Sequence, residues 1–71
     1  MRLKQLRKKK NMTQLRLAME LDMTQNTISR YENGKCQADY QTLILFADYF
    51  NVSLDYLLER TDDPTPPKKE Q

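Results

Sequence analysis

Apolar side chains recur three or four residues apart along most of the chain, which is the spacing of one face of an α-helix. The first three groups are Leu3 with Leu6, Leu17 with Leu21, and Ile28 with Tyr31. A longer stripe follows at Leu43, Ile44, Ala47 and Phe50, and a last group at Leu54, Leu57 and Leu58. This periodicity predicts an all-α fold in which five short helices pack their apolar faces together.

Residues that favour helix ends stand at the boundaries of these groups. The predicted N-caps are Thr13, Thr24, Asp39 and Ser53, because each side chain has an oxygen that accepts a free backbone N–H. The predicted helix stops are Asn11, Asp22, Gly34 and Asn51, which tolerate a positive φ better than other residues do. We therefore expect helices at Arg2–Lys10, Gln14–Leu21, Thr24–Asn33, Tyr40–Phe50 and Leu54–Arg60.

The outward face of the third predicted helix is polar but mostly uncharged. It consists of Thr24, Gln25, Asn26, Thr27, Ser29 and Arg30. A face meant only for solvent usually carries Lys and Glu, whereas amides pair bidentately with adenine and guanidinium groups with guanine in the major groove of DNA. The face alone leaves two interpretations open: a solvated polar surface with helix caps, or a surface that reads DNA bases.

Three segments resemble a known family in the right order and at the right spacing. They are MTQLRLA at Met12–Ala18, TISRYENG at Thr27–Gly34 and LILFADYFNVSLDYLL at Leu43–Leu58. Together they resemble the phage-repressor (Cro-type, XRE) family, with its helix-turn-helix at Gln14–Asn33. The resemblance covers about residues 2–60 and implies a five-helix, lambda-repressor-like DNA-binding domain. The family usually has Gly at the positions of Asn11 and Asp22, and often Pro near Ala38, so these are departures.

The docking mode of that family implies which residues of the third helix contact DNA. The N-terminal part of the helix enters the major groove, so the expected base-reading residues are Gln25, Asn26, Ser29 and Arg30. Arg30 has a second interpretation, as a ligand of phosphate. Thr27 also has two interpretations: its methyl group contacts thymine, or its hydroxyl contacts the DNA backbone. Glu32 resembles a structural acid of the family, which we expect to pair with Arg7.

Other residues are expected to contact the DNA backbone. These are Thr13, Gln14, Thr24, Thr27, Asn33, Lys35, Lys8, Lys9 and Lys10. Residues 1–35 hold nine Lys and Arg against three acids, a net charge of +6, while residues 36–71 carry −4. A basic half of this kind suits a polyanion such as DNA. The alternative for the lysine cluster is a basic face that only aids solubility.

The composition argues against several other classes of protein. The chain has no histidine and one cysteine, Cys36, so we expect no metal site, no cofactor and no internal disulfide. No signal peptide is evident, and the longest apolar stretch, Leu43–Ala47, is too short for a membrane span. An enzyme is not expected, because the chain offers neither paired carboxylates on one surface nor a Gly-rich phosphate loop. Cys36 is interpreted as an incidental surface thiol.

The 71 residues are expected to form a single cytoplasmic domain over residues 1–60, followed by a disordered tail over 61–71. The tail contains three prolines and no apolar residue. No domain for sensing a small-molecule effector and no contact with a membrane are expected. Apolar residues of the last two helices either complete the core or form a dimer contact; the candidates for the contact are Phe46, Tyr49 and Leu57.

The sequence therefore predicts a transcriptional regulator that binds double-stranded DNA sequence-specifically. We expect a homodimer that represses by occupying a palindromic operator. The alternative is a protein-interaction module of the same fold, an antitoxin or adaptor, for which DNA binding is secondary.

Overall fold

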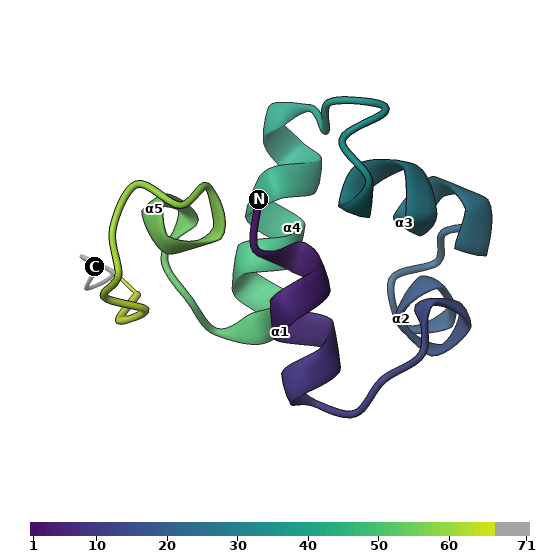
Figure 1. Ribbon diagram of the computed structural model, residues 1–71, viewed down its shortest axis with the longest axis horizontal. Helices are drawn as coiled ribbons and strands as arrows, with labels where there is room; N and C mark the ends of the chain where they lie inside the picture. The colour runs from purple at the N-terminus through teal and green to yellow at the C-terminus, as the bar shows by residue number, and fades with distance from the viewer. Residues whose placement is uncertain (67–71) are drawn as a thin grey trace.

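Five helices and no strand make up residues 1–66, the part of the chain that the computed structural model describes. The helices are α1 (Leu3–Lys9), α2 (Gln14–Glu20), α3 (Gln25–Glu32), α4 (Tyr40–Phe50) and α5 (Leu54–Leu57). In Figure 1, α2 and α3 lie together at one end of the molecule and α5 lies at the other, with α1 and α4 between them. The predicted all-α, five-helix fold is confirmed. None of these helices is long and apolar enough to cross a membrane.

All four predicted N-caps are present, and each accepts a backbone N–H three residues ahead. The N···O distances are 3.0 Å from Arg16 to Thr13, 3.1 Å from Thr27 to Thr24, 2.9 Å from Thr42 to Asp39 and 3.0 Å from Tyr56 to Ser53. Hydrogen bonding by Thr42 also lowers the pKa of Asp39 below its usual value. Each cap satisfies a backbone donor that the first helical turn leaves free, so these positions fix where α2 to α5 begin.

The predicted helix stops also adopt the expected backbone. Asn11 and Asp22 have φ of 57°, Asn51 has 54° and Gly34 has 70°. The end of α5 is different, because Glu59 also has a positive φ of 65°. The predicted helix Leu54–Arg60 is therefore wrong in length: α5 ends at Leu57, and Arg60 N–H donates to the carbonyl of Asp55 at 2.8 Å.

Every helix contributes to one apolar core. The largest fully buried side chains are Leu3, Leu17, Ile28, Phe46 and Leu57, one from each helix. The ring of Tyr31 in α3 packs edge-on against Phe46 in α4, with the ring centroids 5.7 Å apart. Because α3 is held by its buried Ile28 and by the aromatic contact of Tyr31, its outer face is presented from a fixed support.

Two of the three predicted dimer-contact residues are core residues instead. Phe46 and Leu57 have no exposed surface, so neither can touch a second protein while the domain is folded. Their interpretation as dimer contacts is wrong, because burial is set by the packing of all five helices and not by position on one helix. Tyr49 is half-buried, and its hydroxyl donates to a carboxylate oxygen of Glu20 at 3.3 Å.

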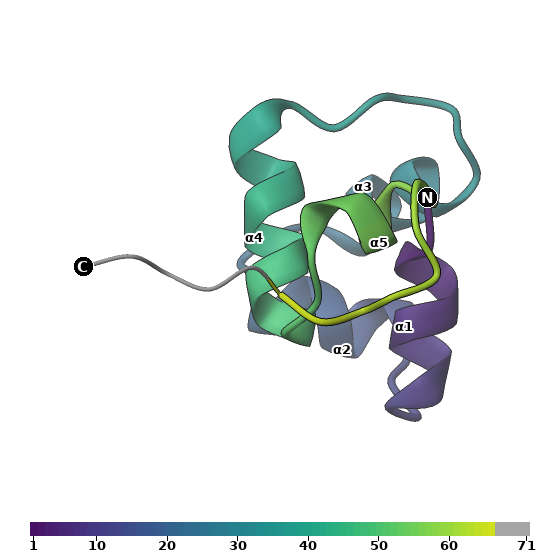
Figure 2. The ribbon, with the colours of Figure 1, turned by 90° about the vertical axis from the view of Figure 1, so that its left-hand side faces the viewer.

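The first part of the predicted tail contacts the domain. The guanidinium of Arg2 donates to the carbonyl of Thr61 at 3.2 Å, and Ser53 N–H donates to the carbonyl of Pro64 at 3.0 Å. Figure 2 shows the chain turning back beneath α5 toward α4. The rest of the predicted tail, residues 67–71, lies outside the described residues.

Candidate nucleic-acid interface

A tight turn joins α2 to α3. Asp22 takes the left-handed backbone, and Met23 N–H donates to the carbonyl of Ala18 at 2.8 Å. Ala18 itself is fully buried, and its small side chain lets the two helices approach closely. The turn and the cap at Thr24 therefore set the direction in which α3 leaves α2.

Three of the four predicted base-reading residues are exposed on α3. Gln25 and Asn26 lie in its first turn and Arg30 lies one turn further on, while Ile28 on the opposite side is fully buried. Within the part of the chain that the structure describes, the side-chain hydrogen bonds include none from these three residues. Their amide and guanidinium groups are therefore available to a ligand on this face.

The smaller polar residues of α3 are tied to one another. The hydroxyls of Thr24 and Thr27 lie 2.8 Å apart, in addition to the cap bond between Thr27 N–H and Thr24. The hydroxyl of Ser29, which is half-buried, accepts a hydrogen bond of 3.3 Å from the side-chain amide of Asn33. These bonds hold Thr24, Thr27 and Asn33, which are predicted to contact the DNA backbone, in place beside the exposed face of α3.

An ion pair with two hydrogen bonds connects α1 to α3, as predicted for Arg7 and Glu32. Arg7 donates from Nε to Glu32 Oε2 at 2.6 Å and from Nη2 to Oε1 at 3.1 Å. The Arg7 and Glu32 side chains are only 9% and 1% exposed. Arg7 also donates from Nη1 to the carbonyl of Met12 at 2.7 Å, so the guanidinium also holds the connection between α1 and α2.

Gln14 belongs to the same network. Its side-chain amide donates to Glu32 Oε1 at 3.1 Å, which links the start of α2 to the end of α3. No local sequence pattern indicates this bond, because Gln14 and Glu32 lie in different helices. Gln14 is thus placed at the junction of three helices; its contact with phosphate stays a prediction.

The predicted phosphate-binding lysines are all exposed. Lys8, Lys9 and Lys10 occupy the end of α1, and Lys35 follows α3. Thr13, which precedes α2, is exposed too, although its hydroxyl already caps that helix. These groups need no rearrangement of the fold to meet an anion.

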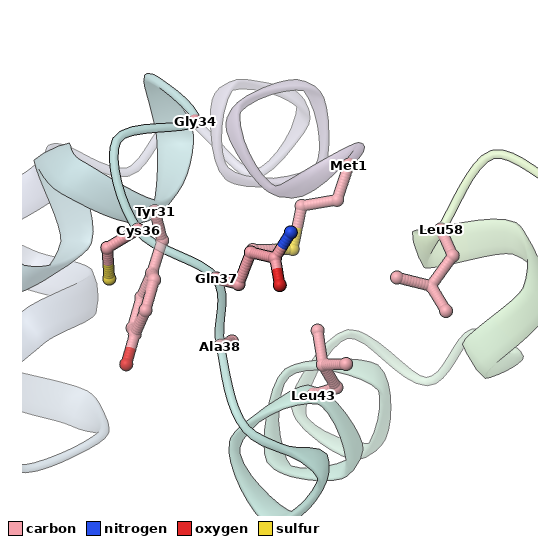
Figure 3. A pocket seen from close by; sticks show the side chains of 8 residues that line it. All are labelled: Met1, Tyr31, Gly34, Cys36, Gln37, Ala38, Leu43 and Leu58. Atoms are coloured by element: carbon pink, nitrogen blue, oxygen red, sulfur yellow. The ribbon is translucent and has the colours of Figure 1, made fainter.

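A hollow of about 440 Å³ lies beside the end of α3, and Cys36 is one of its lining residues. Figure 3 shows Leu43 from α4 and Leu58 from the end of α5 pointing into it, with Met1 and Gln37 lying close together on the other side of the hollow. Its walls come from segments far apart in the sequence, so no sequence pattern predicts it. Within residues 1–66, no group of three His, Cys, Asp or Glu side chains is placed to hold a metal ion.

The fold and this surface define a helix-turn-helix domain. The sequence profile of the helix-turn-helix family matches residues 3–57. The chain therefore belongs to the helix-turn-helix family of the XRE type, and the resemblance seen in the sequence is confirmed.

Curated relatives come from several bacteria. The chain is 44% identical over 57 residues to the uncharacterized HTH-type transcriptional regulator YqaE of Bacillus subtilis, covering 80% of this chain and 49% of YqaE. It is 38% identical over 61 residues to the HTH-type transcriptional regulator ImmR of the same organism, covering 86% and 48%. It is 37% identical over 51 residues to the antitoxin PezA of Streptococcus pneumoniae, covering 72% and 32%. The chain spans about half the length of the first two relatives, and no solved structure matches it.

Proposed function

We propose that this chain is the DNA-binding part of a transcriptional regulator that recognises a specific double-stranded sequence. The observation that carries the proposal is the exposed face of α3, where the polar groups of Gln25, Asn26 and Arg30 make no side-chain hydrogen bond within residues 1–66 and the opposite side of the helix is buried. Amide and guanidinium groups are the side chains that pair bidentately with adenine and guanine. A well-supported helix of this kind reads bases with little loss of conformational freedom.

The Arg7–Glu32–Gln14 network supports the same proposal. It ties α1, α2 and α3 together through bonds of 2.6 to 3.1 Å. The exposed face of α3 is therefore held in a fixed position relative to α1 and α2. Phosphate contacts set the register of a protein on the duplex, whereas base contacts specify the sequence. In this proposal Thr13, Gln14, Asn33 and Lys35 set the register and Gln25, Asn26, Ser29 and Arg30 specify the sequence.

The basic end of α1 supplies attraction that does not depend on sequence. Lys8, Lys9 and Lys10 are exposed and stand in the half of the chain that carries a net charge of +6. Each phosphate that such a group neutralises releases a bound counterion, which makes the affinity fall as salt rises. Binding should therefore weaken with salt for every DNA sequence.

The regulator acts as a homodimer on an inverted repeat in this proposal. A two-fold protein places its recognition helices in successive major grooves, about 34 Å apart along the duplex. Occupying such a site next to a promoter blocks polymerase, so repression is the expected effect. A role in transcriptional regulation is supported by the relatives YqaE and ImmR, which are named as HTH-type transcriptional regulators.

Selection from a random pool of double-stranded DNA tests the proposal. The purified chain is bound at a stated salt concentration, and the recovered sequences are compared with those from the chain in which Gln25, Asn26 and Arg30 are all replaced by Ala. An inverted repeat recovered only by the wild type supports specific recognition by a dimer. A wild-type pool without any enriched sequence contradicts it.

The second candidate function is a protein-interaction module. The similarity to the antitoxin PezA favours it, and Leu15 and Met19 on α2 are 53% and 70% exposed, an apolar pair one helical turn apart. If this candidate is correct, the chain forms a stoichiometric complex with a different protein, and DNA affinity shows little dependence on sequence.

A further inference from the structure

The chain does not leave the domain from the end of α5. Glu59 adopts a positive φ of 65° directly after this helix, and the chain reverses there. Residues 61–66 then run back beneath α5 toward α4 (Figure 2). The sequence suggests nothing of this return, since this segment contains no apolar residue that would hold it against the domain.

Arg2 holds the start of the returning segment. Its backbone N–H donates to the carbonyl of Leu57 at 2.8 Å, and its Nε donates to the carbonyl of Tyr56 at 2.8 Å. Its Nη2 reaches the carbonyl of Thr61 at 3.2 Å and a carboxylate oxygen of Asp62 at 3.1 Å. The guanidinium carbon lies 4.4 Å from the centre of the Tyr56 ring. One side chain thus joins the beginning of α1 to both the end of α5 and the segment after it.

The carbonyl contacts matter more than the ion pair. The Arg2 side chain is 17% exposed, whereas the Asp62 side chain is fully exposed, and an ion pair with such a partner contributes little. The carbonyls of Tyr56 and Thr61 accept from two different nitrogens of one planar group. A lysine has a single ammonium on a flexible stem and cannot reproduce this forked geometry.

A backbone bond holds the far end of the segment. Ser53 N–H, in the connection between α4 and α5, donates to the carbonyl of Pro64 at 3.0 Å. Between the two anchors, Thr61 accepts from Asp63 N–H at 3.2 Å and Asp63 accepts from Thr65 N–H at 3.0 Å. These short-range bonds keep the segment in a compact turn.

We propose that residues 61–66 form a strap across α5 and that Arg2 is the positioning residue that keeps the strap closed. Closure delivers the chain to the connection between α4 and α5, because Pro64 is bonded to Ser53. In Figure 1 this end of the molecule lies opposite α3. The strap therefore ends away from the proposed DNA-reading face, and opening the strap would free Pro64 from Ser53.

Hydrogen exchange at single amides of the full chain, in the absence of DNA, tests this proposal. The Ser53 amide reports on the strap, since its acceptor is Pro64, while the amides of Leu17 and Ile28 report on the rest of the domain. Arg2→Lys, which keeps the charge and the backbone bond, should speed exchange at Ser53 about tenfold or more, as expected when a hydrogen bond to a charged group is lost. Arg2→Ala should do the same, and Asp62→Asn is the matched control for the ion pair.

The proposal requires exchange at Leu17 and Ile28 to stay within about twofold of the wild type in Arg2→Lys, and Ser53 to be equally unaffected in Asp62→Asn. Equal acceleration at Ser53, Leu17 and Ile28 in Arg2→Lys would mean that Arg2 only stabilises the whole domain, and would overturn the proposal. An unchanged Ser53 rate in Arg2→Lys would overturn it too. If Arg2→Ala fails to fold, Arg2→Lys alone decides between these results.

Discussion

Arg7 and Glu32, 25 residues apart in sequence, meet through two hydrogen bonds of 2.6 and 3.1 Å with almost no exposure to solvent. The pair lies between the basic first helix, α1, and the end of α3. Burial of both charges is costly unless each is paired and hydrogen-bonded. Here the remaining bonds from Arg7 to Met12 and from Gln14 to Glu32 complete the network.

Glu32→Gln should destabilise the domain strongly. The change leaves the Arg7 cation buried without a counter-charge, which costs about 3–5 kcal/mol. Urea denaturation followed by circular dichroism measures this loss. Arg60→Ala is the control, because Arg60 and Asp55 form an exposed pair at 3.9 Å whose loss should cost under about 1 kcal/mol. Equal effects of the two changes would show that the buried pair does not hold α3.

Replacing Lys8, Lys9 and Lys10 together by Gln should flatten the salt dependence of DNA binding. If all three neutralise phosphates, the slope of log K against log salt should shrink by roughly 2.7, at about 0.9 per phosphate. Fluorescence anisotropy titrations over a range of salt concentrations give the slope, and the preferred sequence should stay the same. Lys4→Gln, an exposed lysine on the same helix, is the control. An unchanged slope in the triple variant would place this cluster off the DNA.

Glu59→Gly should stabilise the domain. Glu59 has a φ of 65°, and a left-handed backbone costs a non-glycine residue about 1 kcal/mol relative to glycine. Asn51→Gly provides the comparison, since Asn51 has a φ of 54° but asparagine tolerates this conformation. Thermal unfolding should show the larger gain for Glu59→Gly. A loss of stability would mean that the contact of Glu59 with the N-terminal amine, at 3.1 Å, outweighs the strain.

The features that the sequence predicted well are those determined by residues close together in the chain. Thr13, Thr24, Asp39 and Ser53 cap helices because a cap needs only the residue and the three that follow it. The pair of Arg7 and Glu32 came from family resemblance, since nothing local joins α1 to α3. Glu59 was missed as a helix stop because glutamate is not a residue that favours positive φ, and its conformation depends on what surrounds α5.

The errors concerned relations between distant parts of the chain. Phe46 and Leu57 were named as candidates for a dimer contact, with completion of the core as the open alternative, because the last two helices hold many apolar residues. Their complete burial follows from how five helices meet, which no single periodicity specifies. The strap could not be predicted from the sequence either, because it depends on a contact between Arg2 and Thr61, which are 59 residues apart. The exposed face of α3 was easier to predict from the sequence. Gln25, Asn26 and Arg30 share one helix face, and no residue nearby in the sequence competes for their polar groups.

Whether the exposed face of α3 reads bases is tested by measuring Asn26→Ala on single-base variants of the selected site. Anisotropy titrations at constant salt compare the wild type and the variant on the preferred site and on each substitution within it. If α3 reads bases, the variant should lose about 1–3 kcal/mol of binding free energy on the preferred site, with discrimination relaxed at one base pair and retained at the others. Equal weakening on every DNA, with discrimination unchanged at every position, would contradict it.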